Sequence, residues 1–236
     1  MAILLLASIV LPRFASPVTV GYLLLNAVPV LLIALPMTLI IITGEIDLSV
    51  ASIVGLSTST IGTLTLQGWE FGPAVLVAVL VGMVAGAVNG ALIAFVGLPS
   101  LAVTIGTLAL YRGLTLVFIG DNSVSSSQYP GEFSTFINQK LGTTGIPVVI
   151  LIVALIVGIF AVVLHLTPFG RGLYALGYSK EAATFVGINV ALSKFWLYVA
   201  SGFTCGIVGI FWALYYSARS DSATGLELTV IAAVLL

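Results

Sequence analysis

Long apolar stretches alternate with short polar breaks along most of the chain. A helix needs roughly 20 apolar residues to cross about 30 Å of hydrocarbon, and most of the apolar stretches have that length. Glycine and proline mark many of the breaks, as in "GLPS" and "QGWEFGP". The pattern predicts an all-α fold, a polytopic transmembrane helical bundle formed as a single domain by residues 1–236. Its seven expected segments, the first of them short, are Met1–Leu11, Tyr22–Ile42, Ile46–Leu66, Pro73–Val96, Leu98–Ile119, Ile146–Leu166 and Ala191–Tyr216.

The last apolar stretch is too short to cross a membrane. Glu227 is followed only by "LTVIAAVLL", which spans less than half of the residues that a crossing needs. We therefore expect the sequence to stop inside a helix and at least one further segment to follow it in the natural protein.

The positive charges predict the orientation of the bundle. The connection 167–190 carries Arg171 and Lys180, and Lys194 follows it closely. Connections rich in Lys and Arg stay in the cytoplasm, so this connection is expected inside. Counting back through alternating segments places residues 44–47 inside as well.

The same count places residues 120–145, with Asp121 and Glu132, on the outer side. Arg13 and Arg219 then also fall outside, against the charge rule. These two cations weaken the predicted orientation without reversing it.

Composition excludes several classes of function. The chain is 60% hydrophobic and 6% charged, with a net charge of -1, so it has no basic surface that would bind nucleic acid. Cys205 is the single cysteine, which excludes a disulfide or a thiolate metal site within one chain. No catalytic pair occurs in the apolar segments, and we expect no catalytic residue, no metal and no cofactor.

Hydroxyl side chains form polar stripes on two of the predicted helices. In the segment Ile46–Leu66 five of them fall within an arc of about 100° on a helix, and Leu98–Ile119 carries a second stripe. Such hydroxyls bond to carbonyls of their own or a neighbouring helix, or they line a water-filled path. For the second interpretation the candidate lining residues are Ser52, Ser59, Thr63, Thr107 and Tyr111.

Small residues recur at intervals of four in two other segments. Gly82, Gly86 and Gly90 form one ridge, and Gly202 and Gly206 form another. Such spacing lets helix backbones approach closely, so these segments are expected to pack together. Asn89, beside the first ridge, is expected to join helices rather than bind a ligand.

The stretch "GEIDLS", residues 44–49, places two carboxylates between apolar segments. We predict that Asp47 caps the following helix by accepting its free N–H groups, and that Glu45 lies in the turn at the water boundary. A gating or contact role for Glu45 and Asp47 is the alternative hypothesis.

The connection 167–190 contains "GYSKEAATFVGIN", the only part of it with a clear helix pattern. Ser179 suits the N-cap, Glu181 suits the first turn, and Gly187 suits the end. A short helix outside the membrane is expected. It is either a surface connector or a contact site for a soluble partner.

Several motifs occur here in the order found in one known family. "EAATFVG" resembles the EAA loop of ABC importer permeases, and "GEIDLS", "LPSLAVTIGTLALYRG", "TPFGRGLYALG", "SGFTCGIVGI" and "GLELTVIAAV" resemble blocks of their monosaccharide (ribose-type) branch. The similarity runs from about Leu35 to Leu236. Two departures are that Glu45 and Ala51 stand where the family more often has Gly, and that the chain ends before a Gly-Gly that usually follows "IAAV".

The resemblance implies a ten-helix permease of a larger-class ABC importer, in the bacterial plasma (inner) membrane. It implies coupling to separate ABC ATPase subunits through Lys180, Glu181, Ala182, Ala183 and Gly187. Further implied partners are a periplasmic or extracellular solute-binding protein, a second permease chain, identical or different, and membrane lipid. The solute would be a sugar or sugar-like molecule, moved by alternating access.

Two other transporter classes remain as alternatives. A permease of the branched-chain amino acid type would need groups that neutralise a carboxylate and an ammonium, and charge is sparse in the segments. An ion-coupled secondary transporter would be expected to carry acidic residues deep in its segments and inverted repeats, and the sequence has neither pattern.

Overall fold

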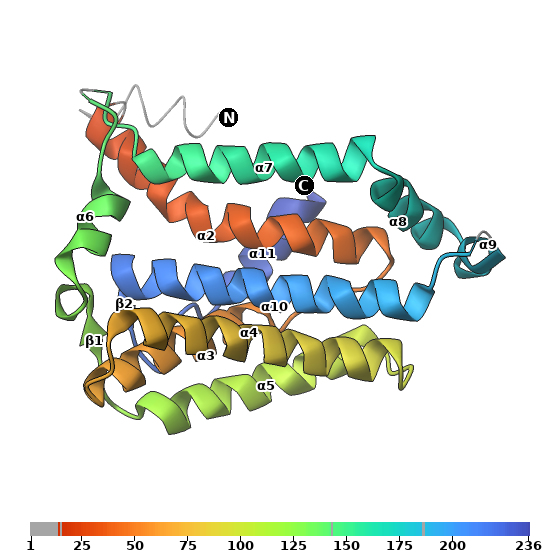
Figure 1. Ribbon diagram of the computed structural model, residues 1–236, viewed down its shortest axis with the longest axis horizontal. Helices are drawn as coiled ribbons and strands as arrows, with labels where there is room; N and C mark the ends of the chain where they lie inside the picture. The colour runs from red at the N-terminus through yellow and green to blue at the C-terminus, as the bar shows by residue number, and fades with distance from the viewer. Residues whose placement is uncertain (1–13, 15, 143, 186) are drawn as a thin grey trace.

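The structure is a computed structural model, and it describes residues 14, 16–142, 144–185 and 187–236. Nearly all of its regular structure is helical (Figure 1), which confirms the predicted all-α bundle. The only strands of the described residues are the two-residue β1 and β2, which pair antiparallel. The elements are α2 (Pro17–Ile42), α3 (Val50–Leu66), α4 (Phe71–Ala94), α5 (Ser100–Ile119), β1 (Val124–Ser125), η1 (Ser126–Gln128), α6 (Gly131–Asn138), α7 (Val148–Leu166), α8 (Pro168–Tyr178), α9 (Lys180–Phe185), α10 (Val190–Tyr215), β2 (Ser217–Ala218) and α11 (Leu226–Leu235).

Five helices are long and apolar enough to cross a membrane: α2, α4, α5, α7 and α10. Each lies within a few residues of a segment predicted from the apolar pattern. The expected first segment, Met1–Leu11, lies outside the described residues, and the full ten-helix arrangement stays a prediction.

The helix α3 is shorter than predicted. It begins at Val50 rather than Ile46, because residues 43–49 form an irregular run whose polar groups are paired inside the bundle. The 17 residues of α3 span about 26 Å at 1.5 Å per residue. The helix therefore starts within the bundle and not at its end.

The centre of the molecule is α3. Every residue from Val50 to Gly62 is buried, and the helix contacts α4, α5 and α10. In contrast, α7 is strongly apolar but little buried, and it lies along α2 at one side of the bundle (Figure 1). A helix that is apolar and exposed in this way suits contact with lipid.

The two glycine ridges pack against each other, as the sequence predicts. A Cβ placed on Gly86 would lie 2.2 Å from the carbonyl oxygen of Tyr198, and one on Gly202 would lie 2.2 Å from that of Gly82. No side chain fits at these distances. The absence of side chains therefore allows the backbones of α4 and α10 to touch.

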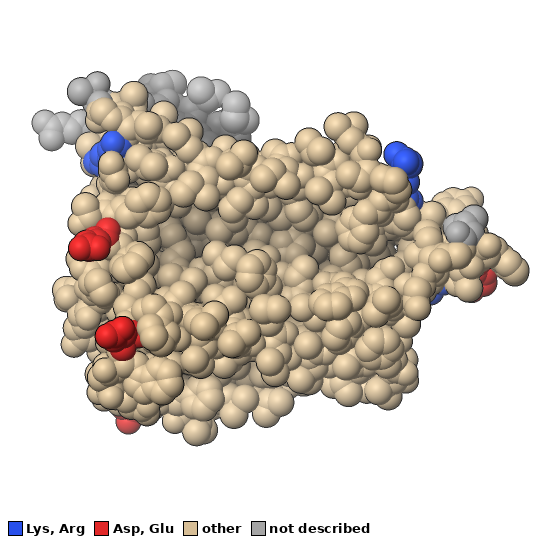
Figure 2. Space-filling model, viewed as in Figure 1, with Lys and Arg blue, Asp and Glu red and all other residues tan. Residues whose placement is uncertain are grey.

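The connections gather at two opposite ends of the bundle. One end carries α6 and the β1–β2 pair, and the other carries α8 and α9 (Figure 1); we name them the α6 end and the α9 end. On the face drawn in Figure 2, charged side chains occur at these ends and the middle is uncharged. This distribution suits a bundle that crosses a membrane from end to end.

The connection 167–190 holds two helices, whereas its sequence pattern predicted only one. The additional helix is α8, which the hydroxyl of Thr167 caps and Pro168 begins. A proline suits the first position of a helix because its missing N–H would have no partner there. Leu173 and Leu176 lie on the buried face of α8, so tertiary packing stabilises this helix.

Candidate functional site

The helix α9 has the local structure that its sequence predicts. The Ser179 hydroxyl oxygen accepts a hydrogen bond from the Ala182 N–H (3.1 Å), and the same hydroxyl donates to Glu181 Oε2 (3.0 Å). Gly187 follows the helix with φ +86°, a conformation that glycine adopts at little cost. Of the predicted coupling residues, Ala183 is buried and Lys180, Glu181 and Ala182 are not.

Two large aromatic residues lie near the ends of α9 and are almost fully exposed: Tyr178 is the last residue of α8, and Phe185 is the last residue of α9. Tyr178 is 94% exposed and Phe185 is 92% exposed. In a segment outside the apolar spans, exposed aromatic side chains are candidates for contact with a partner, where Tyr and Phe are enriched. We name Tyr178, Glu181 and Phe185 the α9 surface. The pKa of Glu181 lies below its usual value because a backbone hydrogen bond and the Ser179 hydroxyl favour the charged carboxylate.

An ion-pair cluster connects α9 to the run that precedes α3. The Glu45 carboxylate accepts a hydrogen bond from Lys194, near the start of α10, and its Oε1 lies 3.8 Å from Lys180 Nζ. The Glu45 side chain is only 12% exposed. Glu45 was predicted to lie in the turn at the water boundary, but its side chain is largely buried beside Lys194, and Lys180 is the more exposed partner.

The partners of Glu45 decide its charge. Burial raises the pKa of this carboxyl. Hydrogen bonds from Lys194 and Ser100 and the charges of Lys194 and Lys180 together lower the pKa by more than burial raises it, so it lies below its usual value. Glu45 is therefore ionised at neutral pH. In the sequence Lys194 serves only as an orientation signal, because no local pattern pairs it with a residue 149 positions earlier.

Asp47 lies two residues beyond Glu45 and is fully buried. Its Oδ1 accepts from the N–H (3.0 Å) and the hydroxyl (2.6 Å) of Ser49, and its Oδ2 accepts from the Ser201 hydroxyl (3.1 Å). Ser49 occupies the N-cap position of α3. Asp47 thus accepts one backbone N–H at the helix start, fewer than predicted, and it also binds α10.

The hydrogen bonds continue from Ser49 into α4 and α5. Asn89 Nδ2 donates to the Ser49 hydroxyl oxygen (2.7 Å), and the Tyr111 hydroxyl donates to the Ala85 carbonyl (2.9 Å) and to Asn89 Oδ1 (3.3 Å). Asn89 joins helices, as its position beside the glycine ridge predicts. We name Asp47, Ser49, Asn89, Tyr111 and Ser201 the buried polar network.

The hydroxyls predicted to line a path are paired with carbonyl oxygens. Ser52 donates to Ser49 O, Ser59 to Leu56 O, Thr107 to Thr104 O and Thr63 to Phe118 O; Tyr111 belongs to the buried polar network. This pairing fits the first of the two interpretations of the polar stripes. A role for these residues in a solute path stays a prediction.

Arg112, at the edge of the stripe on α5, contacts the loop before α11. Its Nη1 donates to the Ser222 carbonyl at 2.6 Å. A guanidinium within a span is costly unless it is paired, and this contact pairs it. The described residues contain no group of three His, Cys, Asp or Glu side chains that could hold a metal.

Comparison with known proteins identifies a family to which the chain is similar. The model of the family described as "Branched-chain amino acid transport system / permease component" matches residues 19–236. No solved structure matches the chain.

Curated relatives carry a more specific description. The autoinducer 2 import system permease protein LsrD of Klebsiella pneumoniae is 34% identical over 210 residues, which are 87% of this chain and 63% of the relative. The LsrD proteins of Photorhabdus laumondii and of a Yersinia pseudotuberculosis strain are 31% and 32% identical, over 100% and 87% of this chain and 73% and 62% of their own lengths. The chain is thus similar to about two thirds of a longer permease. Because the family model matches almost its whole length, the chain belongs to the family of branched-chain amino acid transport system permease components.

Proposed function

We propose that this protein is the membrane-spanning permease subunit of an ATP-driven importer, which moves a sugar or sugar-like solute into the bacterial cell across the inner membrane. Family membership supports the transport role. The relatives named as permeases of autoinducer 2 import support a sugar-like solute. Five helices of spanning length support a multi-pass membrane protein.

In this proposal the energy comes from a separate ATPase. The sequence contains no Gly-x-x-x-x-Gly-Lys-Ser/Thr stretch, which would cradle a nucleotide phosphate. The α9 end then faces the cytosol, and ABC ATPase subunits bind the α9 surface. A solute-binding protein delivers the solute at the α6 end, and a second permease chain completes the path.

The observation that carries the proposal is the connection from α9 to α3. Lys180 begins α9, and Glu45, which pairs with it, lies in the run 43–49 that enters the bundle beside the buried polar network. A displacement of α9 is transmitted along this run to the start of α3. Lys180, Glu181, Ala182, Ala183 and Gly187 act in coupling, and alternating access moves the solute past the hydroxyl-bearing faces of Ser52, Ser59, Thr63, Thr107 and Tyr111.

A purified complex with its ATPase and binding protein, reconstituted in vesicles, tests the proposal. Uptake of autoinducer 2 or D-ribose is expected to require ATP hydrolysis and to stop with a non-hydrolysable analogue. Uptake that continues without hydrolysis would indicate a secondary carrier instead. Uptake of L-leucine in place of both sugars would indicate the amino acid specificity that the family description names.

The α9 surface has its own test. Phe185→Ala removes an exposed ring and is expected to weaken ATPase binding at least tenfold, because aromatic anchors dominate such interfaces. The matched control is Val117→Ala on α5, whose side chain is also exposed but lies among the lipid-facing residues. Equal ATPase binding by both variants would contradict coupling through this surface.

A further inference from the structure

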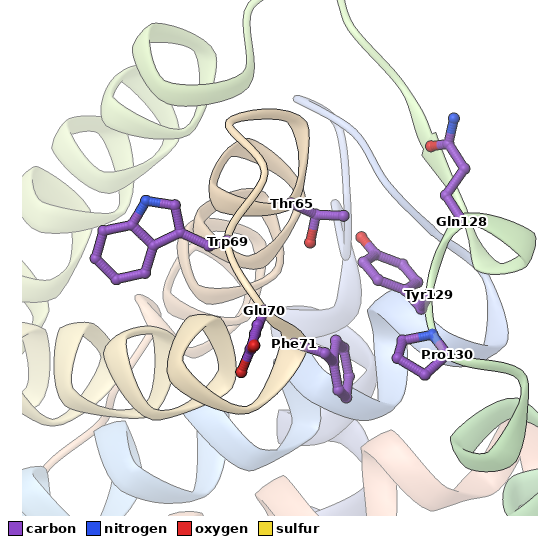
Figure 3. A pocket seen from close by; sticks show the side chains of 7 residues that line it. All are labelled: Thr65, Trp69, Glu70, Phe71, Gln128, Tyr129 and Pro130. Carbon is purple, nitrogen blue, oxygen red and sulfur yellow. The ribbon is translucent and has the colours of Figure 1, made fainter.

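A pocket opens at the α6 end, away from the ion pairs of α9. Its volume is about 480 Å³, within the range of roughly 300–1,000 Å³ that is usual for small-molecule sites. It lies between the end of α3, the start of α4 and the η1–α6 segment (Figure 3). We name it the outer pocket, and its lining residues are Thr65, Trp69, Glu70, Phe71, Gln128, Tyr129 and Pro130.

One polar group of this pocket has no hydrogen-bond partner among the described residues. The Tyr129 hydroxyl is buried and unpaired, and the residue as a whole is only 4% exposed. Figure 3 shows its oxygen pointing toward Thr65 across the pocket. A buried phenol without a hydrogen-bond partner lowers the stability of the folded protein by about 1–3 kcal/mol. Other contacts must therefore hold this side chain in place.

Aromatic packing and backbone pairing hold Tyr129 there. Its ring centroid lies 5.5 Å from that of Phe71, which lies 4.9 Å from the ring of Phe133 on α6. Before Tyr129 in the chain, β1 pairs with β2, which follows α10, and this pairing fixes the position of the η1–α6 segment. These contacts hold the ring so that its buried hydroxyl is directed toward Thr65, where it can donate a hydrogen bond to a ligand that enters between the two side chains.

The other polar groups favour a neutral, hydroxylated ligand. Thr65 donates its hydroxyl hydrogen to Ile61 O, so toward the pocket it can only accept. Gln128 offers amide groups at the exposed rim, and Glu70 places a carboxylate there, which disfavours anions. Burial raises the pKa of Tyr129, so its phenol stays neutral and keeps its proton to donate.

We propose that the outer pocket binds a neutral, hydroxyl-bearing solute before the solute enters the bundle, through a hydrogen bond to the Tyr129 hydroxyl. A solute hydroxyl can accept from Tyr129 and donate to Thr65 at once, and Phe71 and Pro130 supply the apolar surface for its carbon face. The proposal deepens the importer function and rests on it for the side from which the solute arrives. Binding itself can be measured without transport.

The test is binding of D-ribose and of autoinducer 2 to the assembled permease–ATPase complex in nanodiscs, without the solute-binding protein, by saturation-transfer NMR. Tyr129→Phe removes only the hydroxyl, and we expect about tenfold weaker binding, the effect of one hydrogen bond. Thr65→Val is expected to weaken binding to a similar extent. Tyr22→Phe, at an exposed position on α2, is the matched control and should leave binding unchanged.

A stability measurement separates this role from a structural one. Because the Tyr129 hydroxyl has no partner, Tyr129→Phe should leave the apparent melting temperature of the solute-free complex unchanged or raise it. A lower melting temperature would mean that the hydroxyl serves folding, and it would overturn the proposal.

Two further outcomes would overturn the proposed site. One is equal affinity of the native complex and of both pocket variants for the two solutes. The other is equal affinity for L-leucine, which bears no hydroxyl. Neither outcome touches the importer function, which fails only if ATP-dependent uptake is absent.

Discussion

At the scale of single residues, two neighbouring carboxylates have opposite surroundings. Glu45 meets two lysines and is ionised, whereas Asp47 meets only N–H and hydroxyl donors inside the bundle. Glu45 therefore ties the run 43–49 to elements at the α9 end, and Asp47 fixes the start of α3 to α10. Their separation along the chain is two residues, but their roles differ.

Substitution of Asp47 separates hydrogen bonding from charge. Asp47→Asn keeps an acceptor oxygen for Ser49, and we expect a modest loss of stability. Asp47→Leu leaves the Ser49 N–H and two hydroxyls without their acceptor, at about 1–3 kcal/mol for each buried donor that finds no other partner. The apparent melting temperature in detergent measures both; a loss as large for Asn as for Leu would show that the charge itself is required.

Removal of the Glu45 charge tests the ion-pair cluster. The folded-state pKa of Glu45 lies below its usual value near 4.5, so its contribution to stability is present above that pH and is lost as the pH falls through the lowered pKa. Glu45→Gln should therefore be less stable than the native protein at pH 7, by a margin that shrinks below about pH 4.5. The measurement is the melting-temperature difference at pH 7 and pH 4, and a constant difference would contradict the prediction.

At the scale of elements, the most extensive contact is that of α4 with α10. It depends on glycine at both surfaces, because the backbone atoms of one helix occupy the space that a Cβ on the other would take. Close packing of this kind supplies association between helices where lipid removes the hydrophobic driving force. The same contact positions Ser201 on α10 near Asp47 and Asn89 on α4 near Ser49.

Alanine at one of these glycines tests the contact. Gly86→Ala places a methyl group 2.2 Å from the Tyr198 carbonyl, and we expect a loss of about 1–3 kcal/mol, typical of overpacking. Gly158→Ala on α7 is the matched control: nothing lies within 4 Å of its Cβ, and alanine has the higher helix propensity. The melting temperature should fall for Gly86→Ala and rise for Gly158→Ala, relative to the native protein. Equal shifts would show that the ridge contact adds little.

At the scale of the whole molecule, the two ends of the bundle differ in construction. The α9 end presents a short capped helix with exposed aromatic side chains, and the α6 end holds the outer pocket. Two differently built ends suit the directional import proposed above. The charge pattern predicts which end faces the cytosol only through Arg171, Lys180 and Lys194, and Arg219 at the α6 end is an exception.

Cysteine labelling tests this orientation. Cys205 is buried and gives a low background, so Glu132→Cys on α6 and Glu181→Cys on α9 can be compared in whole cells. A membrane-impermeant maleimide should label the first in intact cells and the second only after permeabilisation. The reverse pattern would place the α9 surface outside, and with it the proposed ATPase contact.

The apolar pattern of the sequence predicted the five helices of spanning length, and neighbouring residues predicted the start and end of α9. Apolar runs of spanning length report burial in lipid directly, and the cap at Ser179 and the turn at Gly187 depend only on neighbouring residues. Small residues four apart likewise predicted the packing of α4 on α10. The helix α8 was not predicted, although Thr167 and Pro168 give a local start signal, because the burial of Leu173 and Leu176 that stabilises it depends on the folded bundle.

Which polar side chains pair over long distances along the chain follows only from the tertiary structure. Glu45 with Lys194, Asp47 with Ser201 and Asn89 with Ser49 lie 149, 154 and 40 positions apart, and no local periodicity carries such information. The same holds for the Tyr129 hydroxyl, whose lack of a partner follows from three segments that meet at the α6 end. Local rules place a side chain on a helix, but only the folded bundle determines whether a buried polar group meets a partner.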